Sequence, residues 1–205
     1  MRTLAIRKAL GAVVLLGGVA FAADQLVPTK ILLVKDKPGD ATKRKINFKV
    51  KENASAATVV GDPIASGGAT LHVVLTGGGD QCFSMPASGW SNISDLGFKY
   101  KDPDLTNGAV KVASIKKTPS GVFQIKVTLK GSGSEAITIV PGNPTATYGT
   151  NFALGGGDSY CAGTGTTPAT PNPNDEKTFK VVNDTPPASC TASACASPSG
   201  AFVDR

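Results

Sequence analysis

The chain has 205 residues, a formal net charge of +6 and 40% apolar residues, which is enough apolar material for one folded domain. Its only histidine is His72, so a metal site built from several histidines is excluded and histidine-dependent catalysis is disfavoured. No spacing of nucleophiles, bases or carboxylates singles out a catalytic centre, so we expect no enzymatic activity.

Residues 1–22 are predicted to be a signal peptide. A basic start with Arg2, Arg7 and Lys8 precedes an apolar run over residues 9–21, which ends in the small-x-small pattern Ala20-Phe21-Ala22. This run is shorter than the ~20 residues that span a bilayer, and no later stretch approaches that length. We therefore expect Sec-dependent export, cleavage after Ala22 and a mature chain that is secreted or periplasmic. A retained N-terminal anchor is the alternative.

Cleavage would remove three of the 21 basic residues and none of the 15 acidic residues, leaving a net charge of +3. That charge is too small to predict a nucleic-acid partner. The basic residues are uneven, since the segment 30–51 contains seven lysines and Arg44 but only Asp36 and Asp40 as acids. Contact with an anionic surface is one interpretation. The alternation of these lysines with Ile46, Phe48 and Val50 favours the other, the solvated face of a strand.

The mature chain contains four cysteines, and an even number in an exported protein predicts two disulfides. Two similar segments, Gly77-Gly78-Gly79-Asp80-Gln81-Cys82 and Gly155-Gly156-Gly157-Asp158-Ser159-Tyr160-Cys161, favour a Cys82–Cys161 bond, with Cys190–Cys195 closing a tight loop. The rival pairing is Cys161–Cys190, which would fasten the tail to the body. A metal site is disfavoured because no Cys-x-x-Cys motif is present.

Period-two alternation of apolar and polar residues predicts strands rather than helices after residue 22. The expected strands cover residues 30–34, 45–51, 71–76, 97–101, 109–115, 123–130, 136–140, 151–154 and 178–182. Nine short strands separated by turns predict an all-β fold, an antiparallel β-sandwich of Ig-like or jelly-roll-like type over residues 23–183. Residues 162–174 are expected to form a loop, and residues 184–205 an irregular tail rich in proline, alanine and serine that carries Cys190 and Cys195.

Several phrases follow one another in a recognisable order, among them Met85-Pro86-Ala87-Ser88-Gly89-Trp90 and Gly97-Phe98-Lys99-Tyr100-Lys101-Asp102. Their order resembles that of secreted β-rich domains encoded in environmental, deltaproteobacteria-like genomes, over most of residues 28–195. The resemblance implies a bacterial exported domain. It implies no activity and no functional residues, because none are known for these domains.

Trp90 and the tyrosines Tyr100, Tyr148 and Tyr160 are candidates for stacking on the apolar faces of a sugar. The competing interpretation is that these aromatic rings pack in the core. His72 lies in the apolar strand 71–76, where a strand-face histidine without a chemical task is the favoured interpretation.

The segment 102–108 offers Asp102, Asp104 and Asn107 as oxygen ligands for calcium, the one cofactor considered. Its glycine is one place late for an EF-hand loop, and the twelfth position is Ala113 rather than glutamate. A hairpin turn stabilised by aspartate and asparagine is the alternative.

These observations predict an exported, non-catalytic structural or interaction module of the bacterial cell exterior or periplasm. A protein or glycan of the cell exterior is the expected partner. The alternative functions are a carbohydrate-binding module and, less favoured, a secreted hydrolase acting through carboxylates.

Overall fold

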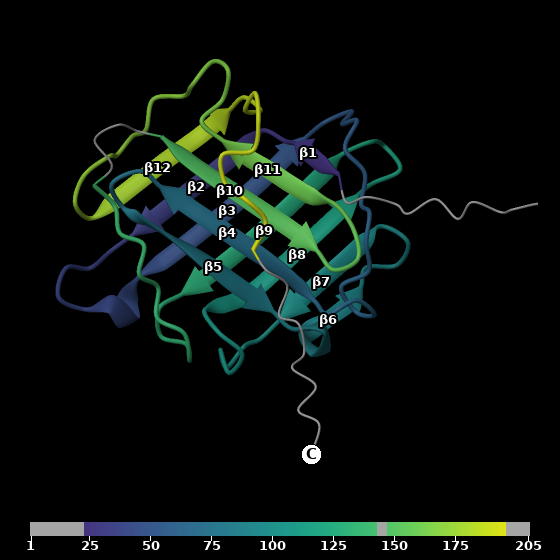
Figure 1. The fold of residues 1–205 in the computed structure, drawn as a ribbon, viewed down its shortest axis with the longest axis horizontal. Coiled ribbons are helices and arrows are strands. Elements are labelled where there is room, and N and C mark those ends of the chain that lie inside the picture. The colour runs from purple at the N-terminus through teal and green to yellow at the C-terminus, as the bar shows by residue number, and fades with distance from the viewer. Residues whose placement is uncertain (1–22, 143–146, 196–205) are drawn as a thin grey trace, which may run out of the picture.

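The computed structural model describes residues 23–142 and 147–195, and the predicted signal peptide therefore lies outside the described residues. The described chain is all-β, with two sheets that are antiparallel except for one strand pair, β1 with β11 (Figure 1). Short 3-10 turns at Ala41–Lys43 and Ala87–Gly89 are its only helical elements. No helix in these residues has the length and apolar character needed to cross a membrane.

The five-stranded sheet has the order β1-β11-β10-β4-β5. Its strands are β1 (Asp24–Leu26), β4 (Ala69–Leu75), β5 (Gly79–Met85), β10 (Tyr148–Leu154) and β11 (Ser159–Gly163). The seven-stranded sheet has the order β12-β2-β3-β9-β8-β7-β6. Its strands are β2 (Thr29–Lys35), β3 (Lys45–Glu52), β6 (Trp90–Asn92), β7 (Gly97–Lys101), β8 (Val110–Lys117), β9 (Phe123–Lys130) and β12 (Thr178–Asp184).

The alternating pattern predicted β7 and β9 with their observed bounds, and it located β2, β3, β4, β8, β10 and β12 with small shifts at their ends. Four strands were missed: β1, β5, β6 and β11. Two of these, β1 and β6, are only three residues long. The other two have no clear alternation of their own: β5 begins at the last glycine of the triplet 77–79, and β11 begins shortly after the triplet 155–157. Such segments become strands because a neighbouring strand supplies hydrogen bonds, not because of local pattern.

The strand predicted over residues 136–140 is wrong. Residues 136–140 form an irregular segment beside β5, held by the Gln81 amide, which donates to the Ala136 carbonyl at 2.8 Å and accepts from the Thr138 amide at 2.8 Å. The opposite edge of the same sheet is similar, since the Gln25 amide donates to the Thr58 carbonyl at 3.0 Å and accepts from the Thr58 amide at 2.8 Å. On each edge strand, therefore, a glutamine side chain hydrogen-bonds to the backbone of an irregular segment. That segment covers the edge where a further strand could otherwise pair.

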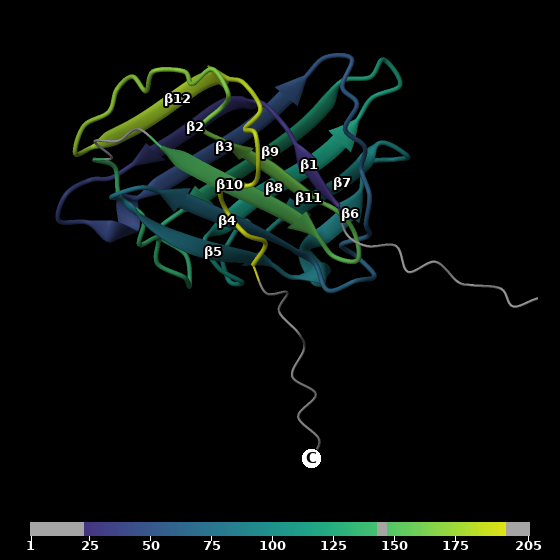
Figure 2. The ribbon, with the colours of Figure 1, turned by 45° about the horizontal axis from the view of Figure 1, so that its top comes forward.

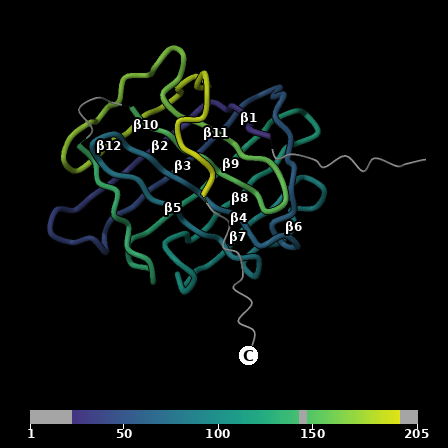
Figure 3. The backbone as a smooth tube through the Cα atoms, viewed as in Figure 1, coloured from purple at the N-terminus to yellow at the C-terminus, as the bar shows by residue number. Residues whose placement is uncertain are grey.

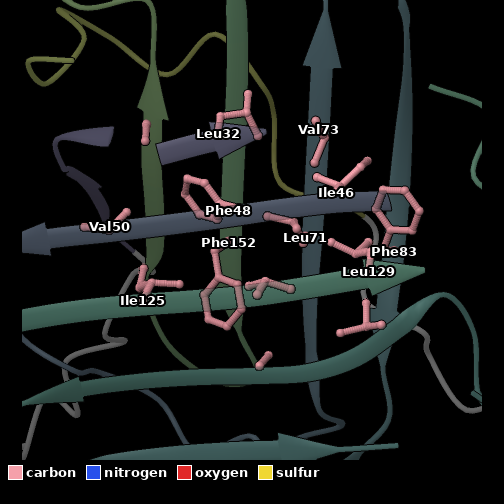
Figure 4. Close-up of a cluster of buried hydrophobic side chains, with 14 of the residues drawn as sticks. Leu32, Ile46, Phe48, Val50, Leu71, Val73, Phe83, Ile125, Leu129 and Phe152 are labelled. Carbon is pink, nitrogen blue, oxygen red and sulfur yellow. The ribbon is translucent and has the colours of Figure 1, made fainter. Parts of the chain in front are cut away.

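The core lies between the two sheets, whose strands run across one another in Figure 4. In β3 the buried residues are Ile46, Phe48 and Val50, and the intervening positions face outward. Aromatic rings join the two layers, because Phe152 of β10 contacts Trp90 of β6 at a centroid distance of 6.4 Å. The alternation that predicted strands thus also predicted which face of each strand is buried.

A C-terminal strap, residues 185–195, crosses the outer face of the five-stranded sheet instead of extending into solvent (Figures 2 and 3). Disulfides fasten it at its middle, through Cys161–Cys190, and at its C-terminal end, through Cys82–Cys195. The glycines beneath it allow close approach, since a Cβ atom at Gly149 would lie 2.8 Å from the Cβ atom of Thr191. The last strand, β12, ends at Asp184, and the strap follows it directly. The rest of the predicted tail, residues 196–205, lies outside the described residues.

The favoured disulfide pairing, Cys82–Cys161 with Cys190–Cys195, is wrong, and the rival Cys161–Cys190 is confirmed. Cys161 lies on β11 and Cys82 on β5, with β10 and β4 between them. Three inter-strand spacings of about 4.8 Å separate these cysteines by about 14 Å, whereas a disulfide requires Cα atoms within about 7 Å. The five residue steps from Cys190 to Cys195 can span about 17 Å in extended form, which is enough for the strap to reach both strands.

Candidate functional site

The outer face of the seven-stranded sheet carries a cluster of lysines, which we call the lysine face. Burial and strand register place ten lysine side chains on it, every one half-buried or exposed. They are Lys35, Lys45, Lys49, Lys51, Lys99, Lys101, Lys116, Lys126, Lys130 and Lys180. These residues come from β2, β3, β7, β8, β9 and β12, so the face is assembled from strands that are far apart in the sequence.

Several of these lysines lie directly opposite one another on neighbouring strands. The register pairs Lys45 with Lys35 on one side and with Lys130 on the other, and it pairs Lys49 with Lys126. Side chains in directly opposed positions have Cβ atoms about 5 Å apart, and like charges there destabilise a sheet. The native fold therefore concentrates positive charge in a way that stability alone does not favour.

Within the part of the chain that the structure describes, no acidic side chain occupies an outward strand position of this face. The other outward strand positions are occupied by small polar, amide and aliphatic residues, with no aromatic ring among them: Ile31, Leu33, Asn47, Ser91, Gly97, Val112, Ser114, Gln124, Thr128, Thr178 and Val182. The two Lys/Arg ion pairs found among the described residues, Asp40–Lys43 and Asp36–Arg44, lie elsewhere, and so does the contact between Asp80 and His72. The ten ammonium groups are thus available to an anionic partner.

The molecule is strongly polarised as a result. Residues 23–205 contain 18 basic and 15 acidic residues, and ten of the basic ones are on the lysine face. Eight basic residues are left against all 15 acidic residues on the remainder of the chain. The net charge of +3 over residues 23–205 therefore conceals a cationic sheet face on an otherwise acidic stretch of chain, and such a field steers anionic polymers toward that face.

The basic segment noticed in the sequence, residues 30–51, contributes only part of this surface. Lys35, Lys45, Lys49 and Lys51 belong to the face, whereas the Arg44 guanidinium is directed to the carboxylate of Asp36 at 2.9 Å. The remaining lysines come from strands whose adjacency the sequence does not reveal. A usable signal was present in residues 123–130, where Lys126 and Lys130 alternate with apolar residues as the lysines of residues 45–51 do.

The chain matches no family model, no curated protein and no solved structure. The lysine face must therefore be interpreted from its own chemistry. A cationic sheet face assembled from several strands, with no aromatic ring at its outward strand positions, is suited to ion pairing with a repeating anion rather than to enclosing a small molecule.

The aromatic residues proposed to bind sugar are buried and do not gather at one surface. Trp90 packs on Tyr100 with ring centroids 5.5 Å apart, and its indole nitrogen donates to the Met85 carbonyl at 3.1 Å. Burial, with the nearby charge of Asp102 as a second cause, raises the pKa of Tyr100 to about 12. The ring of Tyr148 instead contacts that of Phe179, with the ring centroids 6.1 Å apart. Their rings are in the core, so they form no platform for a sugar.

The proposed calcium ligands are arranged as a turn. Asp102 is only 4% exposed, and its carboxylate accepts hydrogen bonds from the Thr106 amide at 3.1 Å and the Asn107 amide at 2.8 Å. Burial by itself raises the pKa of Asp102, but these amides and the Thr106 and Asn107 side chains outweigh it and lower the pKa below its ordinary value. Asp104 is exposed. This arrangement supports the hairpin-turn interpretation.

Replacing Asp102 should destabilise the fold in a pH-dependent way. In Asp102→Ala the two amides lose their acceptor, at a cost of about 1–3 kcal/mol at pH 7. Because the folded-state pKa of Asp102 is lowered, its contribution is complete above the unfolded pKa of about 3.9 and is lost as the pH falls through the folded-state value. Urea unfolding between pH 7 and pH 2 should show the two proteins converging in acid. Asp104→Ala should match the wild type throughout, and an equal loss in that variant would contradict the assignment.

Proposed function

We propose that this protein is an exported, non-catalytic interaction module that binds an acidic polysaccharide on its lysine face. The observation that carries the proposal is the concentration of ten lysines on one face of the seven-stranded sheet, whose described outward strand positions include no acidic residue. The negative charges of a bound polyanion would pair with the opposed ammonium groups and offset the repulsion between them.

Two features favour a glycan over a nucleic acid. Single-stranded nucleic acids are bound by aromatic rings that stack on bases, and the outward strand positions of the lysine face carry none. The two disulfides are compatible with an oxidising compartment, the periplasm or the cell exterior, where we expect the anionic polymers to be glycans. Residues 1–22, which have the pattern of an export signal, point to the same compartments.

The central pair Lys49 and Lys126 offers the sharpest test. In Lys49→Gln/Lys126→Gln we expect affinity for a polyuronate or a sulfated polysaccharide to fall about tenfold at low ionic strength, since each lost ion pair contributes somewhat less than 1 kcal/mol. The fold should be unaffected or slightly more stable, because two opposed like charges are removed. Calorimetric titration and thermal unfolding measure the two effects separately.

The matched control is Lys37→Gln/Lys177→Gln, which removes the same total charge from loops outside the lysine face. It should bind almost as tightly as the wild type. Equal weakening in both variants would show that only net charge matters and would contradict a defined site. Tighter binding to DNA than to the acidic polysaccharide at matched salt would contradict the glycan assignment.

A further inference from the structure

The strap crosses a single row of residues on the five-stranded sheet, on the opposite side of the molecule from the lysine face. The register places Cys82, His72, Asn151 and Cys161 side by side on β5, β4, β10 and β11. Each of the four is attached to the strap, the two cysteines by disulfides and the other two by hydrogen bonds to the Ser193 and Ala192 carbonyls. The only histidine in the chain therefore lies directly beside a cystine.

His72 is held in the orientation of a metal ligand. Its Nδ1 atom is 2.9 Å from the Ser193 carbonyl oxygen, which can only accept, so this hydrogen bond requires the proton to be on Nδ1. In the neutral imidazole the lone pair is then on Nε2. A histidine that binds metal through one nitrogen typically donates from the other to a carbonyl or carboxylate, as this one does.

The groups around His72 complete a set of ligands. One ligand atom of His72 and the sulfurs of Cys82 and Cys195 all lie within 4.8 Å of one another. On its other side Nε2 is 3.4 Å from a carboxylate oxygen of Asp80. In a tetrahedral zinc site the bond lengths place neighbouring ligand atoms about 3.3–3.8 Å apart. The separation between Nε2 and the Asp80 oxygen already has that value. The two sulfurs must part to reach it, and the Asp80 carboxylate, which lies outside the close group of His72, Cys82 and Cys195, must approach them.

Access distinguishes this cystine from the other one. In this cystine Cys82 is exposed and Cys195 half-buried, whereas in the other Cys161 is only 1% exposed and Cys190 half-buried. A reductant reaches an exposed disulfide first, since exchange requires attack at sulfur. At the Cys161–Cys190 cystine, the one further ligand that the described residues bring into the group is the carboxylate of Asp24, which lacks the softness of an imidazole.

We propose that reduction of the Cys82–Cys195 disulfide creates a zinc site formed by His72, Cys82 and Cys195, with Asp80 as the fourth ligand. A dithiol reductant supplies two electrons and two protons, the sulfur–sulfur bond breaks, and the dithiol becomes a disulfide. Zn²⁺ then displaces the two thiol protons into solvent and binds both thiolates. The disulfide and the zinc site use the same two sulfurs, so they are mutually exclusive. The proposal does not depend on the lysine face.

Co²⁺ titration of the reduced protein tests this site, because tetrahedral cobalt with thiolate ligands has intense visible and near-ultraviolet absorption. The protein is reduced with limiting phosphine, two free thiols are confirmed by colorimetric assay, and the reductant is removed before titration. We expect one Co²⁺ per chain, displacement by Zn²⁺, and no such spectrum in the oxidised protein. His72→Ala should weaken Co²⁺ binding about a hundredfold.

The variant Cys82→Ser/Cys195→Ser should give no cobalt spectrum after the same reduction, whereas Cys161→Ser/Cys190→Ser should keep it. Near-ultraviolet circular dichroism of each reduced protein, before and after metal is added, monitors the fold, and Zn²⁺ should raise the melting temperature of the reduced wild type. The proposal is overturned if the reduced protein gives no tetrahedral spectrum. It is also overturned if the spectrum survives in His72→Ala with unchanged affinity or follows Cys161 and Cys190 instead.

Discussion

Removing the Cys82–Cys195 disulfide by paired serine substitution should lower the free energy of unfolding by about 4–5 kcal/mol. This bond joins residues 113 positions apart, and cross-linking so long a loop removes the corresponding entropy from the unfolded chain. Guanidinium unfolding followed by the fluorescence of the single, buried Trp90 measures the change. The denaturant slope should rise, because the unfolded chain without the cross-link exposes more surface.

The Cys161–Cys190 bond provides the comparison, since it encloses only 29 positions. Loop entropy alone predicts a loss of about 3.6 kcal/mol for its removal. A loss below about 1 kcal/mol for Cys82→Ser/Cys195→Ser, with an unchanged denaturant slope, would show that the strap does not constrain the chain and would refute this prediction.

Asp184→Ala should cost about 3–4 kcal/mol of stability, because one buried carboxylate serves several donors. Asp184 is 2% exposed at the end of β12. It accepts hydrogen bonds from the Tyr148 hydroxyl at 3.0 Å, the Ala169 amide at 3.0 Å and the Gly165 amide at 3.3 Å. Alanine leaves these donors unsatisfied in the interior, where water cannot replace the acceptor. Equilibrium unfolding measures the loss.

Asp175→Ala is the matched control for Asp184→Ala. The Asp175 carboxylate also accepts from two backbone amides, those of Lys177 and Thr178, both at 2.8 Å, but it is exposed. Water can take its place, so we expect a loss below about 1 kcal/mol. Similar losses in the two variants would mean that burial does not amplify the cost at Asp184.

The candidate site was only partly predictable, for reasons that differ between its parts. The lysines of β3 and β9 were expected to face solvent, because Ile46, Phe48 and their counterparts had to face the core. That Lys49 lies opposite Lys126 required the pairing of β3 with β9, which are separated by some 70 residues of sequence. Local pattern carries no information on such pairing, since hydrogen bonds between any two strands are chemically alike.

The sugar-binding and calcium-binding hypotheses chose residues whose side chains instead make contacts within the fold. An isolated tryptophan beside a turn has the same local sequence whether its ring is exposed or packed on Tyr100. Asp102 likewise lies in a segment whose sequence resembles a calcium loop, but its carboxylate accepts hydrogen bonds from backbone amides of a turn. In both cases the deciding quantity was burial, which depends on the opposite sheet.

The sequence by itself determined that the chain forms strands, which side of most strands is buried, and that its four cysteines form two disulfides. These properties follow from neighbouring residues and from composition, so they can be predicted without knowledge of the fold. The tertiary structure decided which cysteines meet, which lysines form one surface, and that the C-terminal strap lies across His72. Each of these is a contact between segments distant in the chain, and such contacts are fixed by sheet order and register, which local sequence does not encode.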